Sequence, residues 1–179
     1  MNIQVSETFR FCPRCGAGAT EVRDPQRFLC TECDHCFYFN PACAVAAIIK
    51  DESGRILFIR RKREPSKGKL SLPGGFVDPG ENAESALVRE TKEEVNLDIV
   101  SARYLCSASN HYDYRGVTYT VADFFFAASV ASFQPLSPQQ SEVDDIHFLP
   151  LTSETISQLA FPSLSYALRH PNFQNQSLQ

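Results

Sequence analysis

The stretch PGGFVDPGENAESALVRETKEEVNL, from Pro73 to Leu97, decides the fold of this chain. Its first part is rich in glycine and proline, which indicates a turn. Asn82 is a typical N-terminal helix cap, and Asn96 is a residue that tolerates the left-handed conformation in which many helices end. The stretch therefore predicts a glycine-rich turn followed by one helix that runs from Asn82 to about Val95.

Three glutamates of this helix share one face, because Glu90, Glu93 and Glu94 stand at i, i+3 and i+4. Like charges at that spacing destabilise a helix, and Arg89 alone is placed to steady them. Carboxylate oxygens are the ligands that Mg²⁺ and Mn²⁺ prefer, and a diphosphate can complete the shell of such an ion. Spacing alone leaves a metal site and an ordinary solvated face both open. The neighbouring face, expected to pack onto a sheet, carries Leu87, Val88, Thr91 and Val95.

The segments around the helix alternate between predicted strands and turns. Runs rich in β-branched and aromatic residues predict strands, and the turn DESG between the first two of them predicts a hairpin. The predicted strands cover residues 44–50, 55–61, 98–109, 117–130 and 145–151, and short helices are predicted near 152–159 and 163–170. Loops are expected at 62–75 and 134–142, and the tail from Asn172 is expected to be frayed.

Composition and charge narrow the class of protein. The chain has 179 residues, 43% of them hydrophobic, and a formal net charge of −4, which is typical of a soluble globular protein. An acidic balance gives no overall field for nucleic acid, and the short basic run Arg60–Arg63 suits a solvated strand end or a contact with an anionic ligand. No signal-peptide pattern and no apolar stretch of about 18 residues occurs. We therefore expect a cytoplasmic protein that does not enter the membrane.

Five of the seven cysteines lie within one short N-terminal segment, where CPRC and CTEC form two C-x2-C pairs. Two such pairs can close a tetrahedral thiolate shell around zinc, and a segment this short has too little apolar material to fold unaided. Four thiolates leave no open coordination position, so this Zn²⁺ would be structural. The expected ligands are Cys12, Cys15, Cys30 and Cys33, although His35 or Cys36 could replace one of them. Residues 1–40 are predicted to form a zinc ribbon.

The residues from Gly75 to Leu97 resemble the Nudix box, G-x5-E-x7-R-E-U-x-E-E-x-G-U, in which U is a bulky aliphatic residue. The matching positions are Gly75, Glu81, Arg89, Glu90, Glu93, Glu94 and Leu97. Thr91 stands at one aliphatic position and Asn96 at the last glycine, while Glu84 lies outside the pattern. The resemblance to the Nudix hydrolase superfamily implies an α/β (α+β) fold over residues 41–179, an α/β/α sandwich with a mixed sheet.

The resemblance also implies roles for these residues. Glu90, Glu93 and Glu94 would coordinate Mg²⁺ or Mn²⁺, with a possible contribution from the Gly75 carbonyl. Arg89 would orient the carboxylates, and Glu81 would support the junction between loop and helix. The general base is expected to be either Glu93 or Glu142. Glu142 is similar in position to a site glutamate of the NADH pyrophosphatase branch, which lies a few residues before an aromatic strand residue.

A zinc ribbon followed by a Nudix domain is similar to that same branch, and the likeness covers nearly the whole chain. It implies hydrolysis of the diphosphate bond in a nucleoside diphosphate derivative, giving a nucleoside monophosphate and a phosphorylated product. The segment SASNHYDYRG lacks the tryptophan and prolines of the branch signature, so ADP-ribose and NADH or NAD⁺ stay equally open. Tyr112 and Tyr114 could stack on the substrate. The alternative is a nucleotide-sensing protein without turnover. A nucleotide-capped RNA end and a homodimer stay open as partners.

Overall fold

Two strands in the interior of the protein carry residues that alternate between two hydrophobic cores. They are β4 (Ala42–Ile49) and β5 (Ile56–Arg61) of the computed structural model, which describes residues 2–18 and 24–174. One core contains Val45, Ala47, Ile49, Leu57 and Ile59, and the other contains Ala46, Ile48, Ile56 and Phe58. Successive side chains of a strand point to opposite faces of the sheet. Both faces are covered, which explains why these strands are nearly continuous apolar runs.

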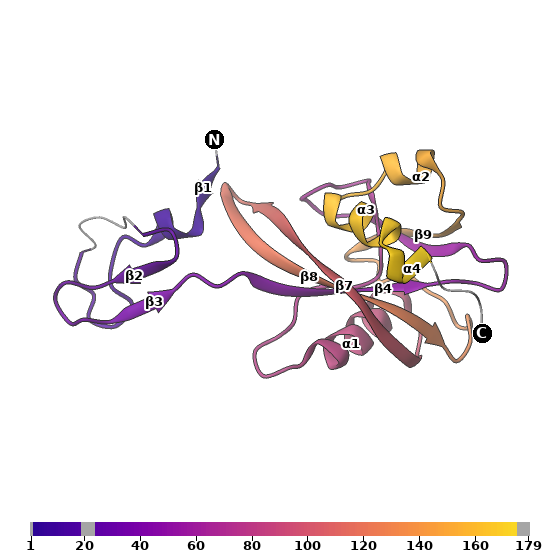
Figure 1. The fold of residues 1–179 in the computed structure, drawn as a ribbon, viewed down its shortest axis with the longest axis horizontal. Helices are drawn as coiled ribbons and strands as arrows, with labels where there is room; N and C mark the ends of the chain where they lie inside the picture. The colour runs from indigo at the N-terminus through magenta and orange to yellow at the C-terminus, as the bar shows by residue number, and fades with distance from the viewer. Residues whose placement is uncertain (1, 19–23, 175–179) are drawn as a thin grey trace. The chain divides into compact units, whose positions relative to one another are not determined.

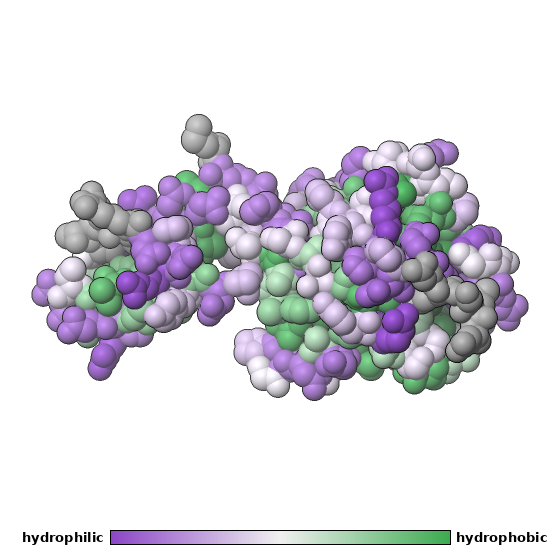
Figure 2. Space-filling model, in the orientation of Figure 1, coloured by the Kyte–Doolittle hydropathy of each residue, from purple (hydrophilic) through white to green (hydrophobic). Residues whose placement is uncertain are grey.

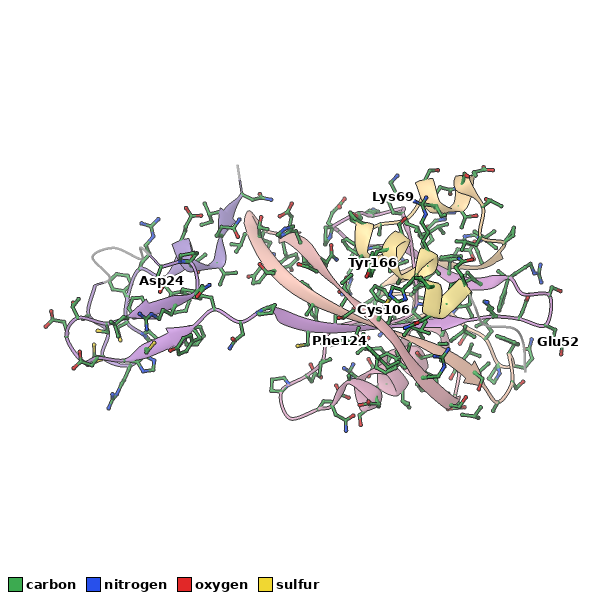
Figure 3. The ribbon with its side chains drawn as sticks, in the orientation of Figure 1. Asp24, Glu52, Lys69, Cys106, Phe124 and Tyr166 are labelled. Carbon is green, nitrogen blue, oxygen red and sulfur yellow. The ribbon has the colours of Figure 1, made fainter. Side chains whose placement is uncertain are left out.

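Helices cover the two faces of the strand layer. Figure 1 shows α1 (Ala83–Val95) on one side of β4, β7 and β8, and α3 (Pro162–Arg169) with α4 (Pro171–Gln174) on the other. Cys106 of β7 belongs to the core under α3 and α4, and Phe124 of β8 packs against the core under α1 (Figure 3). The predicted α/β/α arrangement is therefore confirmed.

The strands form a mixed arrangement of sheets. β8 (Val117–Val130) pairs with β4 and with β7 (Ile99–Tyr114), and it also pairs in parallel with β1 (Ile3–Gln4). β5 pairs antiparallel with β6 (Leu70–Ser71) and with β9 (Val143–Leu149). The register of β5 against β9 shifts between Arg60 and Arg61, which is a bulge. Parallel and antiparallel pairs thus occur together, as expected for a mixed sheet.

Several local predictions were wrong. β4 and β5 share a single bridge between Lys50 and Ile56 after their turn, and then pair with different partners, so they do not form the predicted hairpin. The predicted loop 62–75 contains β6. Val88 is 45% exposed instead of packed, and Phe173 of the tail is 3% exposed because α4 holds it in the core. The rest of that predicted frayed tail, beyond Gln174, lies outside the described residues.

The chain divides into two units, called here the first unit (Met1–Ala42 with His111–Val121) and the second unit (Cys43–Asn110 with Ala122–Gln179). The predicted domain boundary after residue 40 stays a prediction. The first unit also contains a 3-10 helix, η1, and two short antiparallel strands. Their bounds are η1 Val5–Thr8, β2 Arg27–Leu29 and β3 Cys36–Tyr38. The second unit includes α2 (Ser153–Ser157).

The core of the first unit is small. Its buried members are Cys12, Phe28 and Cys30, with Phe9, Ala17, Cys33 and Phe39 packed around them. So few apolar side chains cannot hold a unit of this size without a staple such as a metal or a disulfide. Across the described residues, no helix is both long and apolar enough to cross a membrane.

Candidate functional site

Four cysteine side chains of the first unit converge on one point. The Sγ atoms of Cys12, Cys15, Cys30 and Cys33 all lie within 4.8 Å of one another. Cys12 Sγ and Cys33 Sγ are 3.8 Å apart, and Cys15 Sγ and Cys30 Sγ are 3.7 Å apart. A tetrahedral zinc ion with Zn–S distances of about 2.3 Å sets its ligands about 3.8 Å from one another. The spacing of the thiols therefore fits one zinc ion.

Two turns with the same hydrogen bonds present these cysteines. Gly16 N–H donates to Cys12 O, and Asp34 N–H donates to Cys30 O, at 2.9 and 3.1 Å. Cys12 N–H donates to Ala17 O, as Cys30 N–H does to His35 O. Gly16 and Asp34 hold corresponding positions with φ of 76° and 57°, in the left-handed region. The repeated geometry explains how both C-x2-C pairs aim their thiols the same way.

The predicted alternatives to these ligands lie outside the group of four. Neither His35 nor Cys36 belongs to it, and Cys36 instead pairs with Leu29 in the β2–β3 ladder. Burial raises the pKa of Cys12, but hydrogen bonds from the backbone N–H groups of Cys15 and Arg14 outweigh it and lower that pKa to about 6. The hydrogen bond from the His35 backbone N–H lowers the pKa of Cys33, but burial and the neighbouring thiols outweigh it and raise that pKa to about 12, so the lowered pKa belongs to Cys12 and is not shared by the whole group.

In the second unit, α1 begins and ends where the sequence predicts. Asn82 Oδ1 accepts a hydrogen bond from Ser85 N–H at 2.8 Å. Asn96 adopts φ 57°, and its N–H donates to Lys92 O at 3.0 Å. The side chain of Asn96 also donates to Pro135 O at 2.9 Å. Both caps fix where the helix begins and ends, and the burial of Ala86, Leu87, Thr91 and Val95 against the sheet sets the direction of its glutamates.

Arg89 is the centre of the carboxylate cluster. Its Nε and Nη2 donate to the two oxygens of Glu81 at 3.1 and 2.9 Å, which is a bidentate pair. Nη1 donates to Glu90 Oε1 at 2.8 Å and to Glu93 Oε2 at 3.4 Å. Nη2 also donates to Phe76 O at 3.0 Å. One guanidinium therefore joins the glycine-rich turn to three glutamates.

The two glycines of the turn make room for the other carboxylates. Gly74 N–H donates to Glu94 Oε2 at 2.8 Å. A side chain at Gly75 would place its Cβ 2.6 Å from Glu90 Oε1, so the absence of a side chain there lets that carboxylate lie against the backbone. The Gly75 carbonyl accepts Val45 N–H at 2.9 Å, which leaves it one further lone pair for the predicted metal contact.

Burial and repulsion perturb these carboxylates in a way that a cation would relieve. Burial raises the pKa of Glu94 to about 8, and the charges of Glu90 and Glu142 add to the rise against the Gly74 hydrogen bond. Burial also raises the pKa of Glu90, although Arg89 opposes the rise. Oxygen donors in this charge environment fit a divalent cation such as Mg²⁺ or Mn²⁺. The carboxylate oxygens lie farther apart than the cysteine thiols. Among the described residues, no set of three carboxylates has its oxygens within 4.8 Å of one another, as the four thiols do.

Ionisation of Glu94 is expected to couple stability to pH. Its folded pKa of about 8 exceeds the ordinary value of 4.5, so between these values the folded state holds a proton that the unfolded state has lost. The stability from this proton is fully present below pH 4.5 and is lost as pH rises through about 8. In thermal melts of the metal-free protein, the midpoint temperature should fall as the pH is raised from 4.5 to about 8. Over the same pH range, the affinity for added Mg²⁺ should rise, because a carboxylate must lose its proton to bind a metal ion. Glu94→Gln should remove the fall, and an unchanged slope in that variant would contradict the assignment.

Glu142 lies close enough to the glutamates of the Nudix box to influence their ionisation. The negative charge of Glu142 helps to raise the pKa of Glu90 and the pKa of Glu94. Arg63 Nη1 donates to Glu142 Oε1 at 2.7 Å, and Lys62 N–H donates to Glu142 O at 2.9 Å. Lys62 Nζ also reaches Gln140 O at 2.7 Å. The end of β5 therefore fixes the loop that carries Glu142.

The structure does not bring all the predicted residues into one unit. Tyr112 and Tyr114 belong to the first unit, where their rings are 6.5 Å apart, whereas the box residues belong to the second. Their substrate contact stays a prediction, as do the roles of the glutamates. Sequence reasoning did not predict the Gly74 N–H bond to Glu94, and it considered Arg63 only as part of a basic run, not as the partner of Glu142. A backbone donor has no residue-type signature, and Arg63 lies 79 positions from Glu142 in the chain.

Comparison with known structures agrees with the fold described above. The protein resembles the crystal structure of a NUDIX hydrolase from Nitrosomonas europaea, with a TM-score of 0.68 and 22% identity over 93% of this chain and 92% of the other. It also resembles the NUDIX domain of Shewanella oneidensis NrtR complexed with ADP ribose, with a TM-score of 0.58 and 25% identity over 72% of this chain and 84% of the other.

Two curated relatives match in sequence over shorter spans. The ADP-ribose pyrophosphatase of Methanocaldococcus jannaschii is 53% identical over 60 residues, which are 34% of this chain and 35% of the relative. The NAD-capped RNA hydrolase NudC of Chromobacterium violaceum is 28% identical over 142 residues, 79% of this chain and 50% of the relative. The chain thus spans a third to a half of the length of these relatives. A family model, the NUDIX domain, matches residues 40–165. Since this match covers more than half of the chain, the protein belongs to the NUDIX family.

Proposed function

We propose that the protein is a metal-dependent pyrophosphatase that hydrolyses the diphosphate bond of a nucleoside diphosphate derivative of the ADP-ribose or NADH/NAD type. The observation that carries the proposal is the complete Arg89-centred cluster, in which Glu81, Glu90 and Glu93 share one guanidinium. The names of the matched relatives, an ADP-ribose pyrophosphatase and an NAD-capped RNA hydrolase, support the same substrate class.

Glu90, Glu93, Glu94 and the Gly75 carbonyl would hold Mg²⁺ or Mn²⁺. When bound, such ions neutralise a diphosphate and lower the pKa of a coordinated water. Arg89 keeps two of the carboxylates in place, and its bond to Glu81 fixes the guanidinium to the turn. Attack of water on phosphorus breaks the bond between phosphorus and the bridging oxygen. The water proton passes to a carboxylate, and the leaving phosphate departs with the bridging oxygen.

Glu93 and Glu142 are the candidates for the proton acceptor. Both side chains are about half exposed, at 50% and 45%, so both can reach a solvent water. Glu93 accepts a long hydrogen bond from Arg89, at 3.4 Å. Glu142 is held by the shorter contact to Arg63. The two residues therefore differ in what positions them, and substitution of Arg63 separates their roles.

Arg63→Gln is expected to lower kcat by about tenfold if Glu142 is the base, because a misplaced base loses part of the roughly 10²–10⁴-fold contribution of proton transfer. Stability should change by less than about 1 kcal/mol, since the pair is exposed. Steady-state kinetics with thermal melts test this. Arg55→Gln, which breaks the pair between the half-exposed Arg55 and the Asp51 carboxylate, is the control for loss of an arginine–carboxylate pair. A normal kcat in Arg63→Gln beside a strongly reduced kcat in Glu142→Gln would exclude positioning by Arg63.

Product mass spectrometry tests the function itself. The protein, loaded with zinc and supplied with Mg²⁺, is incubated with NADH, NAD⁺, ADP-ribose, FAD, diadenosine polyphosphates, nucleoside triphosphates and a nucleotide-capped RNA. A nucleoside monophosphate with the complementary phosphorylated product identifies the substrate. Binding of one member without any product would instead favour a nucleotide sensor. The cytoplasmic location and the homodimer stay predictions.

A further inference from the structure

A pocket of about 380 Å³ lies entirely within the first unit. Its walls come from the start of the chain at residues 4–6, the end of β3 and the residues after it, and residues 118–120 of β8. These walls are joined by regular structure. Ile3 and Gln4 pair in parallel with Val117 and Thr118, and Ile3 N–H donates to Gly116 O at 3.0 Å. The volume lies in the range of about 300–1,000 Å³ that is usual for small-molecule sites.

Four of the residues that line the pocket are aromatic. Phe37, Tyr38, Phe39 and Tyr119 all line the pocket, and three of them are well exposed, at 42% for Phe37, 58% for Tyr38 and 38% for Tyr119. Figure 2 shows hydrophobic residues at the surface of this unit among hydrophilic ones. Rings exposed together in a concave place mark a binding surface more often than a lone exposed ring does.

Two of the aromatic residues in the lining pack against further aromatic rings. Phe9 contacts Phe37 and Phe39 with ring centroids 5.1 and 4.8 Å apart, and it also contacts Phe28 of the core at 5.6 Å. Phe37 and Phe39 themselves meet edge to face at 5.7 Å. Two of the lining residues, Phe37 and Phe39, are therefore anchored through Phe9 to the small core that contains Cys12 and Cys30, and ring positions fixed in advance favour stacking of a flat ligand.

The polar part of the lining is neutral. It consists of the side chains of Gln4, Ser6, Asn40, Thr118 and Thr120, and among the residues that the structure describes no lysine, arginine, histidine, aspartate or glutamate lines the pocket. Thr118 already donates to Asp113, at 2.5 Å. A side-chain amide such as that of Asn40 offers donors and an acceptor together. This combination suits a flat, uncharged ring whose edge carries both donors and acceptors, and it does not suit a phosphate.

We propose that this pocket binds a nucleobase, with any attached phosphate left outside in solvent. Aromatic side chains stack on bases of any sequence, and amide groups can pair with the edge of a base. The proposal rests on residues of the first unit alone. Its test is therefore independent of the hydrolysis that is proposed for the second unit. The base could belong to a free nucleotide or to a single-stranded nucleic acid.

Binding of nucleosides to the zinc-loaded protein tests the proposal. Adenosine, guanosine, cytidine and uridine are titrated, followed by short single-stranded RNA and DNA and by inorganic diphosphate. Amide NMR shifts locate the site, and calorimetry gives the affinity. We expect shifts at Tyr38, Asn40 and Tyr119. Tyr119→Ala should weaken binding by about tenfold, as loss of one base–aromatic stack does. Tyr166→Ala removes an exposed tyrosine of α3 and should leave it unchanged.

Comparison of nucleosides with oligonucleotides identifies the molecule that supplies the base. Tighter binding of oligonucleotides than of nucleosides, with the same shifted amides, identifies single-stranded nucleic acid as the source of the base. Equal binding identifies a free nucleotide. Asn40→Ala, at an exposed position where folding is not at risk, should change the preference among the four bases. Shifts confined to the second unit, competition by diphosphate, or unchanged affinity in Tyr119→Ala at normal zinc content would overturn the proposal.

Discussion

Replacement of Glu93 by glutamine is expected to lower kcat by about 10²–10⁴-fold, because it removes a charge that either holds metal or accepts the proton of the attacking water. The fold should persist. The Glu93 side chain is half exposed, and its contact with Arg89 is the longest of the three that join Arg89 to glutamates. Glutamine keeps the size of the side chain. Steady-state kinetics against the substrate found by mass spectrometry, with thermal melts of the same samples, measure both effects.

Glu84→Gln is the matched control for this loss. Glu84 lies in the first turn of the same helix, is exposed, and stands outside the box pattern. The same change of charge at that position should leave kcat within about a factor of two, since an exposed charge far from the reaction contributes little. Normal turnover in Glu93→Gln would contradict the metal-site interpretation of the helix. Equal losses in both variants would point to a general effect of charge on the helix.

Replacement of Cys30 by serine is expected to unfold the first unit. Its core is too small to be stable alone, and zinc binding in comparable cysteine sites contributes about 10–16 kcal/mol to folding. Zinc content should fall from one ion per chain to almost none. NMR signals of the first-unit amides should lose their dispersion, while the second unit keeps its unfolding transition because it has two cores of its own.

Cys36→Ser is the matched control for zinc, because Cys36 lies three residues beyond the last thiol of the group and outside it. We expect this variant to keep its zinc and its dispersed spectrum. Loss of zinc in Cys36→Ser, or its retention in Cys30→Ser, would show that the ligand set differs from the four converging thiols. Addition of a strong chelator to the unaltered protein should reproduce the effect of Cys30→Ser.

Local signals in the sequence predicted those elements whose boundaries are themselves local. Asn82 and Asn96 cap α1 because the chemistry of a cap involves only the nearest turn. The DESG turn was also predicted, yet β4 and β5 leave it for different sheets. Turn chemistry fixes how a chain reverses direction but not which distant strand each arm then meets. β6, only two residues long, forms because β5 provides it with a partner.

In the candidate site, too, features set by nearby residues were predictable and features set by distant residues were not. Spacing on one helix was enough to predict that Glu90, Glu93 and Glu94 stand near each other. It could not predict that Gly74 N–H binds Glu94, because every residue except proline offers such a donor. Val88 was wrongly expected to be packed, since an apolar side chain at the edge of a helical stripe is often left exposed. Asp34 in a left-handed turn had no sequence signal beyond its place after a C-x2-C pair.

The alternation along β4 and β5 has a consequence for the evolutionary record of this family. Val45, Ala47 and Ile49 face the helix that carries the glutamates, while Ala46 and Ile48 face the C-terminal helices. A change in size at one position is best offset by a neighbour in the same close-packed core. Aligned homologues should therefore show two sets of covarying positions that interleave residue by residue along the same strands, with little correlation between immediate neighbours in the chain.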